Sequence, residues 1–197
     1  MATKEPPARG PYAKGVARRQ QIVDTALDQF AEHGVDGASL RVLGEAIGVS
    51  TATLGHYFAS RDELLVEVYR AHEQRRAGWD QPGSVLEAIA ETAEKNVSVP
   101  GLVRLYATLV ADALQESHPA TTDFVRDRFR ELRGLLEGRI RDAQQRGAMT
   151  DAVEPADAAA LVIAASDGLQ LQWLLDPEEI DMPRVLGLLE RILPAAD

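Results

Sequence analysis

The sequence has 197 residues, 45% of them hydrophobic, which is enough for one large domain or for a small domain joined to a larger one. It contains no cysteine, which excludes disulfide bonds and cysteine-ligated metal sites and fits a reducing compartment. The net charge of −10 argues against a nucleic-acid partner, but residues 1–76 carry ten Lys/Arg and ten Asp/Glu, whereas residues 77–197 carry eleven against twenty-one. This asymmetry predicts two parts with different partners.

Residues 1–15 are rich in proline, glycine and basic side chains, and they predict a flexible basic arm. They contain no apolar segment of the kind that a secretory signal peptide needs. The longest wholly apolar run, 158–165, is too short to cross a bilayer. We therefore expect a cytoplasmic protein with no membrane partner.

Helical periodicity begins directly after the arm. Apolar residues recur with the spacing of one helix face and predict a first helix at about 16–33. Ser39 is placed to cap a second helix, because a serine hydroxyl can accept from the unpaired N–H groups of a first turn. The apolar residues that define these two helices are Val23, Ala26, Leu27 and Phe30 in the first and Leu40, Leu43 and Ile47 in the second.

A turn at Gly48 separates the second helix from a third one, expected at 51–58, which Ser50 can cap. Two short helices joined by a turn and preceded by a longer helix form the outline of a helix-turn-helix, whose second helix enters the major groove of DNA. Leu54 and Phe58 can face the core, which leaves the polar side of the third helix for the groove. A capping box at 60–63 predicts that a fourth helix follows at once.

Gly55 is unusual in this position, because glycine in a helix interior costs about 1 kcal/mol relative to alanine. Two explanations remain open. On the groove side, a missing side chain lets a base edge or the DNA backbone approach closely. Alternatively, the glycine merely weakens a short helix that tertiary packing holds in place.

The rest of the chain also has helical periodicity and no alternating segment long enough for a strand. Prolines at or near the expected starts support these helices, because the missing N–H is harmless there. The chain is therefore predicted to be all-α, with about nine helices. The later helices are expected at about 84–96, 101–116, 121–146, 155–175 and 182–193, and the prolines are Pro100, Pro119, Pro155 and Pro183.

The stretch RRQQIVDTALDQFAEHGVDGASLRVLGEAIGVSTATLGHYFASRDELL, residues 18–65, resembles the TetR family of bacterial transcriptional regulators. The shared pattern is a first helix ending in Phe and Gly, a Ser-started second helix, Gly-Val-Ser, a Thr-Leu pair, an aromatic pair ending in Phe, and a Ser and a basic residue before Leu-Leu. The family usually has tyrosine or another large residue where this chain has Gly55. The resemblance implies a helix-turn-helix domain at 16–62 and a dimerisation and ligand-sensing domain at 63–197.

By this resemblance, a set of residues in the first part would contact DNA. Arg41 and Arg61 would meet phosphate, although either could also be a solvated helix end. His56 could read a base or simply be exposed, and Tyr57 could bind the DNA backbone or belong to the core. The full set is Lys14, Arg18, Arg19, Ser39, Arg41, Ser50, Thr51, Ala52, Thr53, Gly55, His56, Tyr57 and Arg61.

The segment AALVIAASDGLQLQWLLDP resembles the penultimate helix of the family's C-terminal domain, whose last two helices form a four-helix bundle with a second subunit. We therefore expect a homodimer, although the same apolar surface could be intrachain core. The expected interface residues are Leu161, Ala165, Gly168, Leu169, Val185, Leu188, Leu189 and Ile192.

The family resemblance also implies a pocket between the middle helices for a small-molecule effector. Aromatic residues at helical spacing are equally explained as plain core. No cluster of charges in the sequence indicates a highly charged effector. The expected lining residues are Leu102, Tyr106, Leu109, Phe124, Val125, Phe129 and Trp173.

The sequence thus predicts a homodimeric regulator that binds a palindromic operator in double-stranded DNA, a repressor released by a small apolar or amphipathic ligand. The alternative is a DNA-binding dimer without a small-molecule effector, controlled by a protein partner or by its own abundance. An enzyme is disfavoured, because the four histidines lack metal-binding spacing and no glycine-rich phosphate loop is present. We expect no catalytic residues, no metal and no cofactor.

Overall fold

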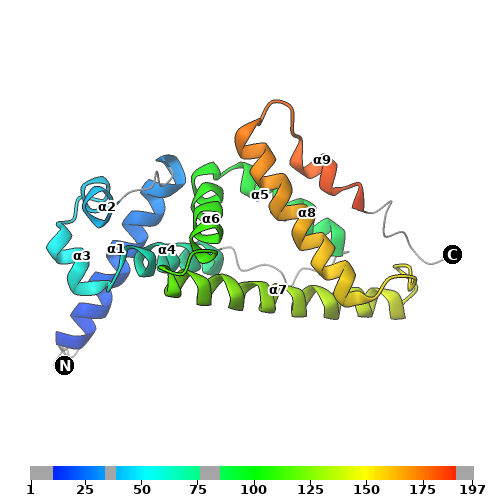
Figure 1. Ribbon diagram of the computed structural model, residues 1–197, viewed down its shortest axis with the longest axis horizontal. Coiled ribbons are helices and arrows are strands. Elements are labelled where there is room, and N and C mark those ends of the chain that lie inside the picture. Colours follow the sequence, from blue (N-terminus) through cyan, green and yellow to red (C-terminus); the bar gives the residue numbers. More distant parts are fainter. Residues whose placement is uncertain (1–10, 34–38, 76–84, 190–197) are drawn as a thin grey trace, which may run out of the picture.

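The computed structural model describes residues 11–33, 39–75 and 85–189 of the chain. In these ranges it contains nine α-helices and no β-strand, which confirms the all-α prediction (Figure 1). The helices are α1 (Pro11–His33), α2 (Leu40–Ala46), α3 (Thr51–Tyr57), α4 (Arg61–Arg75), α5 (Val85–Val97), α6 (Pro100–Ala113), α7 (Pro119–Gln145), α8 (Pro155–Leu175) and α9 (Met182–Leu186).

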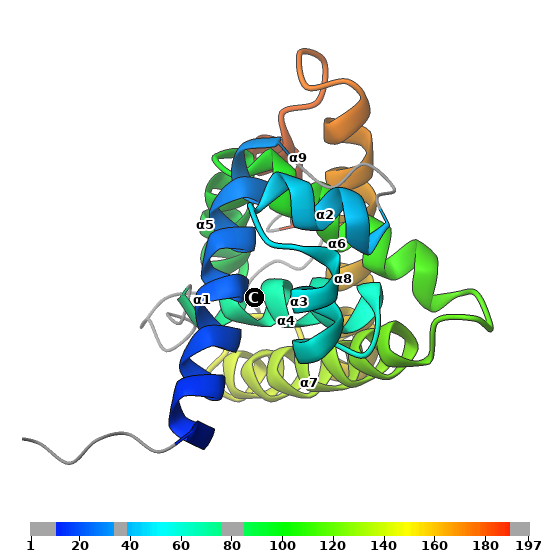
Figure 2. The same ribbon diagram turned by 90° about the vertical axis from the view of Figure 1, so that its left-hand side faces the viewer.

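Helices α1, α2 and α3 pack together at one end of the molecule, away from α8 and α9 (Figures 1 and 2). The predicted inner face of α1 is confirmed, since Val23, Ala26, Leu27 and Phe30 are all buried. These side chains form one apolar cluster with Leu43 of α2 and with the inner side of α3. Burial of this face stabilises α2 and α3, which are too short to be stable alone.

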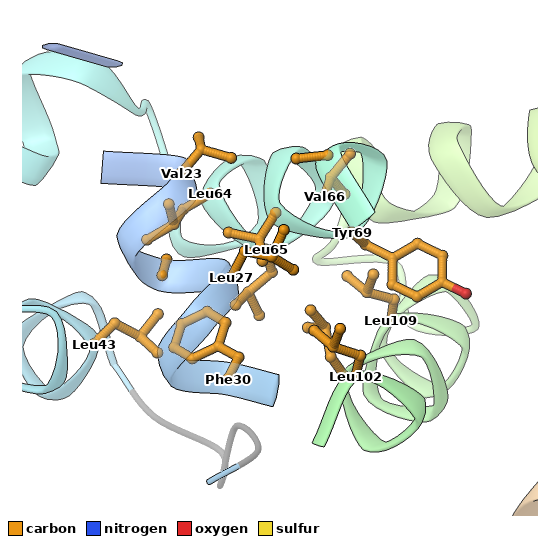
Figure 3. Packing of buried hydrophobic residues seen from close by; sticks show 14 of the residues in the cluster. Val23, Leu27, Phe30, Leu43, Leu64, Leu65, Val66, Tyr69, Leu102 and Leu109 are labelled. Atoms are coloured by element: carbon orange, nitrogen blue, oxygen red, sulfur yellow. The ribbon is translucent and has the colours of Figure 1, made fainter. Parts of the chain in front are cut away.

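Helix α4 joins this end to the rest of the molecule. Leu64 and Leu65 are fully buried, and Figure 3 shows them between α1 and the α6 residues Leu102 and Leu109. One apolar cluster therefore extends from α1–α4 into α6 and α7, across the boundary that the sequence predicted after residue 62. A movement of α4 relative to α6 would have to disturb this shared core.

A second apolar cluster holds α5, α7, α8 and α9 together. Helices α7 and α8 have 27 and 21 residues and run in opposite directions along each other (Figure 1). The predicted role of the prolines is confirmed, because each lies at the first or second residue of its helix: Pro100, Pro119, Pro155 and Pro183.

Two helix boundaries differ from the predictions. Helix α1 begins at Pro11, so the prediction of a flexible arm is wrong for residues 11–15, because a proline in the first turn does not oppose a helix. Helix α9 ends at Leu186, where Gly187 caps it, so it is shorter than predicted within the described residues; residues 190–193 of the predicted helix lie outside them. Residues 1–10 of the predicted arm, and Ile192, lie outside the described residues.

Helix α8 is unusually apolar for a helix at the surface. Among the described residues it is the one helix that is long and apolar enough to cross a membrane by length and composition, although the longest uninterrupted apolar run is short. Only 28% of its most apolar stretch is buried within the chain. Leu161, Leu171 and Leu175 are exposed on it. The packing of a single chain therefore does not explain why this apolar side of α8 is exposed.

Candidate nucleic-acid interface and interior cavities

Two glycines determine the turn between α2 and α3. Gly48 has a φ angle of +69°, a backbone conformation that favours glycine, and this confirms the predicted turn. A Cβ on Gly44 would lie 2.4 Å from the carbonyl oxygen of Val49. The backbones are this close because the N–H of Val49 donates to the Gly44 carbonyl at 2.8 Å. The sequence reasoning missed Gly44, whose one visible signal is a glycine inside a predicted helix.

The start of α3 is capped as predicted. The Ser50 hydroxyl accepts from the backbone N–H of Thr53 at 3.1 Å and lies 2.8 Å from the Thr53 hydroxyl. Ser39 occupies the corresponding position before α2, but its side chain makes no capping hydrogen bond. Its exposed hydroxyl therefore contributes little to the stability of α2 and remains accessible to a binding partner.

Helix α3 has one apolar side and one exposed side. Leu54 is 0% exposed and Phe58, directly after the helix, is 1% exposed, which confirms their predicted core position. The opposite side lies at the end of the molecule, turned toward the viewer in Figure 2. Its exposed residues are Thr51, Ala52, Gly55 and His56.

Gly55 is not required by packing within the chain. A Cβ at this position would have nothing within 4 Å. His56 is exposed, and its ring meets the edge of Tyr57 at a centroid distance of 4.9 Å. Tyr57 is partly buried against the apolar cluster, so the core explanation holds for part of its surface. The contacts that these side chains make with DNA remain predictions.

The predicted DNA-binding cations divide into exposed and paired groups. Lys14, Arg18 and Arg41 are exposed, and Arg41 forms a surface ion pair with Glu45 one turn away. Exposed pairs of this kind are worth only about 0.3–0.5 kcal/mol, so they yield easily to a phosphate. These three side chains remain available for sequence-independent attraction to DNA.

Arg19, in contrast, holds α1 to α4. Its guanidinium lies 3.1 Å from Glu63 and 2.8 Å from Glu67, and it covers the Phe58 ring at 4.8 Å. Burial raises the pKa of Glu67, but the hydrogen bond and charge of Arg19 outweigh it and hold that pKa below its ordinary value. Arg19 therefore positions helices, and its charge is already offset.

Arg61 is likewise engaged within the chain. Its guanidinium donates to Asp112 at 2.9 Å and to Asp62 at 3.3 Å, and its side chain is 20% exposed. The predicted capping box is confirmed for Ser60, which accepts from the Glu63 N–H, whereas the Glu63 carboxylate accepts from the N–H of Ala59 instead of that of Ser60. A phosphate would have to compete with two carboxylates for Arg61, so the structure favours its role as a link between α4 and α6.

Asp62, Asp112 and His118 are the described residues that come nearest to a metal site. One ligand atom from each lies within 4.8 Å of the others, and the His118 Nδ1 is 2.7 Å from Asp62. Arg61 already donates to both carboxylates, however, so the cluster is internally paired. It joins the first turn of α4 to the α6–α7 connection, which the sequence reasoning did not find.

Three cavities lie among the helices of the larger part. The first is bounded by α4, α5, α7 and α8 with a volume of about 70 Å³, the second lies between α7 and α8 with about 230 Å³, and the third lies between α6 and α8 with about 250 Å³. Asp167 of α8 borders all three.

Only two of the seven predicted pocket residues line these cavities. Tyr106 borders the α6–α8 cavity and Phe129 the α7–α8 groove. The other five are packed in the apolar clusters and line none of the three, which favours the core explanation for them: Leu102, Leu109, Phe124, Val125 and Trp173. Four of these five belong to the cluster shared with α1–α4.

A chain of polar side chains runs beside the cavities. The Tyr106 hydroxyl donates to Asp167 Oδ2 at 3.1 Å and accepts from Arg128 at 3.0 Å, and Arg128 also donates to Glu73 at 2.7 Å. These residues belong to α6, α8, α7 and α4. The sequence shows no cluster of charges here, because the four residues are far apart along the chain and only packing brings them together.

Burial changes the pKa values of these polar side chains. It raises the pKa of Asp167, against a smaller opposing effect of Arg128 and Tyr106. It also raises the pKa of the Tyr106 hydroxyl, which remains neutral. For Arg128, burial opposes ionisation, but the oxygens of Tyr69, Tyr106 and Glu73 outweigh it and raise the pKa above its ordinary value. Arg128 is therefore charged.

The predicted interface residues differ in exposure. Leu161 is 50% exposed and Leu188 is 43% exposed, as an interface requires. Leu189 is 5% exposed and packs in the second cluster, so it has no further surface to bury in a dimer, and its prediction is wrong. The others described are partly buried: Ala165, Gly168, Leu169 and Val185.

Both parts of the chain match models of known protein families. Residues 22–68 match the bacterial regulatory proteins of the tetR family. Residues 84–196, more than half of the chain, match the C-terminal region of BetI-type transcriptional repressors.

Individual proteins with related sequence or fold are also regulators. UidR of Escherichia coli K12, an HTH-type transcriptional regulator, is 24% identical over 169 residues, which are 84% of this chain and 84% of UidR. A putative transcriptional regulator from Saccharomonospora viridis in complex with choline has 21% identity and a TM-score of 0.71, over 90% of this chain and 98% of that one. SmeT of Stenotrophomonas maltophilia, in complex with triclosan, has 21% identity and a TM-score of 0.69, over 92% and 93%. These names describe regulators of transcription and not enzymes. The chain therefore belongs to the TetR family of bacterial transcriptional regulators.

Proposed function

We propose that this TetR-family regulator is a cytoplasmic homodimer that binds a palindromic operator and represses transcription until a small molecule enters its larger part. The observation that carries the proposal is the outer side of α3, which is exposed at one end of the molecule and is backed by the buried side chains of Leu54 and Phe58. A helix held in this way can enter the major groove without rearranging.

The polar groups on this side suit DNA. The hydroxyls of Ser50, Thr51 and Thr53 lie at the helix N-terminus, where N–H groups and the helix dipole favour phosphate oxygens. His56 is placed to meet a base edge or a phosphate. Because a Cβ at Gly55 would meet nothing in the chain, the space beside it supports close approach of DNA. Ser39 and the exposed cations Lys14, Arg18 and Arg41 would add phosphate contacts.

Dimerisation is supported by the exposed apolar side of α8. A leucine-rich surface that includes Leu161, Leu171 and Leu175 is costly in water and is typical of a protein interface. Leu135 of α7 is also 42% exposed. Pairing of α7 and α8 with their copies about a two-fold axis would bury these side chains. Two α3 helices could then reach half-sites roughly 34–36 Å apart.

The cavities support control by a small molecule. A larger part filled completely by side chains would favour control by a protein partner or by abundance, but cavities of up to about 250 Å³ lie between its helices. The structural neighbours in complex with choline and with triclosan have the same fold. Helix α4 borders the smallest cavity through Tyr69 and begins directly after α3. We therefore expect α4 to transmit ligand binding to the DNA-binding helices.

Operator selection tests the proposal. The purified protein is incubated with random double-stranded DNA, and the retained DNA is sequenced. We expect a palindrome with half-sites about one helical turn apart. Retention without a motif, or no retention at low salt, would contradict a sequence-specific regulator.

A matched pair of leucine variants tests the dimer. Leu161→Glu places a charge on the exposed side of α8, whereas Leu114→Glu places one at the 85% exposed end of α6. We expect the first variant to be monomeric by light scattering and to lose the operator, and the second to remain dimeric. Equal behaviour of the two variants would remove the α8 surface from the interface.

A further inference from the structure

We propose that the effector of this regulator is a protonated amine with a short apolar body, and that the Asp167 carboxylate binds its ammonium group. This inference rests on the ligand-responsive function proposed above. It is carried by the position of Asp167 at the meeting point of all three cavities.

The hydrogen bonding of Asp167 leaves one acceptor open. Its Oδ2 accepts from the Tyr106 hydroxyl at 3.1 Å. No group in the described part of the chain donates to its Oδ1. Asp167 is partly buried, and its Oδ1 is not among the buried side-chain atoms without a partner, so water reaches it and a ligand N–H can take the place of that water. An ammonium group supplies both the missing donor and the opposite charge.

The charges around the cavities favour a cation over an anion. Arg128 is the nearby cation, but Glu73 offsets its charge through an ion pair of 2.7 Å. Arg128 also donates to the Tyr106 hydroxyl and lies over the Tyr106 ring at 4.4 Å and the Tyr69 ring at 5.6 Å. Arg133 borders only the α7–α8 groove and is exposed to solvent. Asp167 is therefore the charge that remains without an ion-pair partner.

The α6–α8 cavity determines the rest of the ligand. It is lined mainly by apolar side chains, among them Val103, Val110 and Leu171, with Asp167 and Gln170 as its polar groups. Its volume of about 250 Å³ is below the roughly 300–1,000 Å³ of typical ligand pockets. It suits a short alkyl or aryl body attached to a single ammonium group.

The same carboxylate offers a route to the DNA-binding helices. Asp167 is linked through Tyr106 and Arg128 to Glu73, which lies on α4. A ligand that draws the Asp167 carboxylate toward itself changes the partner of the Tyr106 hydroxyl. The Arg128–Glu73 pair, and with it the position of α4, then responds. Burial raises the pKa of Asp167, which agrees with a carboxylate that lacks a cation in the unliganded protein.

Three eight-carbon probes that differ only in the head group test this inference. Calorimetric titration compares octylammonium, 1-octanol and octanoate on the full-length protein near neutral pH. We expect octylammonium to bind at least about tenfold more tightly than 1-octanol, equivalent to about 1.4 kcal/mol, and octanoate most weakly. Octylammonium should also release the selected operator.

Asp167→Asn removes the charge while conserving shape, and Asp157→Asn is the matched control on an exposed part of the same helix. We expect the first variant to bind octylammonium no better than 1-octanol and the second to retain the preference. Unchanged 1-octanol binding by Asp167→Asn shows that the cavity is intact. If that variant does not fold, Tyr106→Phe serves instead, because it keeps the carboxylate and should retain the preference.

The inference is overturned if the wild type does not prefer octylammonium, binds none of the probes in the millimolar range, or keeps its preference after Asp167→Asn. Loss of the preference in Tyr106→Phe would also contradict it. These failures are distinct from failure of the proposed function, because operator selection uses the same protein without a probe. A protein that selects a palindrome but ignores amines refutes this inference alone.

Discussion

The two ends of the molecule use burial in opposite ways. Around α3, the buried side chains are apolar, and Leu54 and Phe58 leave almost no exposed surface. In the larger part, polar side chains such as Tyr106, Arg128 and Asp167 lie between the helices, next to the cavities. The first arrangement fixes the position of α3, and the second leaves space and charged groups between the helices at the expense of stability.

The difference separates two tasks that one shared core connects. A helix that reads DNA needs a fixed position, which dense packing provides. A site that responds to a ligand needs an element with two accessible arrangements. Helix α4 belongs to both ends, because it packs in the cluster of α1–α3 and also borders the cavity next to Asp167.

Removal of one core side chain from each end gives the largest expected contrast. Leu54→Ala should lower the free energy of unfolding by about 2–5 kcal/mol, because the closely packed site cannot collapse around the lost methyl groups. Leu132→Ala should cost less, because Leu132 is partly buried and already borders a cavity. Denaturant unfolding compares the two. An equal loss would mean that the larger part is as tightly packed as the α3 end.

The same substitution at two glycines of the helix-turn-helix should have opposite signs. Gly44→Ala places a Cβ 2.4 Å from a backbone oxygen and should destabilise the protein by about 1–3 kcal/mol. Gly55→Ala meets open space and should stabilise α3 by about 1 kcal/mol.

Gly55→Ala also decides between the two explanations of this glycine. If DNA approaches it closely, operator affinity falls while stability rises, and we expect this result in a binding titration. Unchanged affinity would leave Gly55 without a role in the groove.

Two arginines distinguish links within the chain from contacts with DNA. Arg61→Ala should destabilise the protein by about 1–2 kcal/mol, because it removes charged hydrogen bonds to Asp112 and Asp62. The dependence of operator affinity on salt should not change. Arg41→Ala should instead reduce the slope of log affinity against log salt by about one, the contribution of one phosphate contact. A reduced slope for Arg61→Ala would restore it to the DNA surface.

The smallest expected effect is the pH-dependent stability of Asp167. Burial raises its pKa in the folded protein, so the folded state holds the proton more tightly than the unfolded state. Stability is therefore greatest below the ordinary aspartate pKa and is lost as pH rises through the raised one.

Asp167→Asn cannot ionise, and it should raise Tm by about 2–4 °C at neutral pH, equivalent to about 1 kcal/mol in a chain of this size. The gain should disappear at acidic pH. A melting series over pH measures it, with Asp157→Asn as the control for an exposed carboxylate. A gain that does not depend on pH would contradict the assigned cause.

The sequence predicted the α3 end closely because its signals are local. The inner face of α1, the turn at Gly48, the Ser50 cap and the capping box at Ser60 depend on residues a few positions apart. Gly44 was missed because its reason is a backbone oxygen of the following turn. Arg19 and Arg61 were assigned to DNA because their carboxylate partners, Glu63 and Asp112, are distant in the sequence and could not be identified from it.

The larger part was predicted as helices but not as a site. Periodicity located α5–α8 and the prolines located the starts of α6–α9. It did not separate Tyr106, which borders a cavity, from Leu102, which is core on the same helix. Most of the side chains expected to line a pocket are packed in the two apolar clusters.

The sequence by itself determined the all-α class, the helix-turn-helix and its outward residues, because helix period, caps and turns act over a few residues. Only the tertiary structure decided which cations are paired, which part of α8 stays exposed, and that Asp167, Tyr106, Arg128 and Glu73 meet. These outcomes depend on how four helices, distant in the chain, pack against each other, and the free energy of burying a charge is defined only once its neighbours are in place.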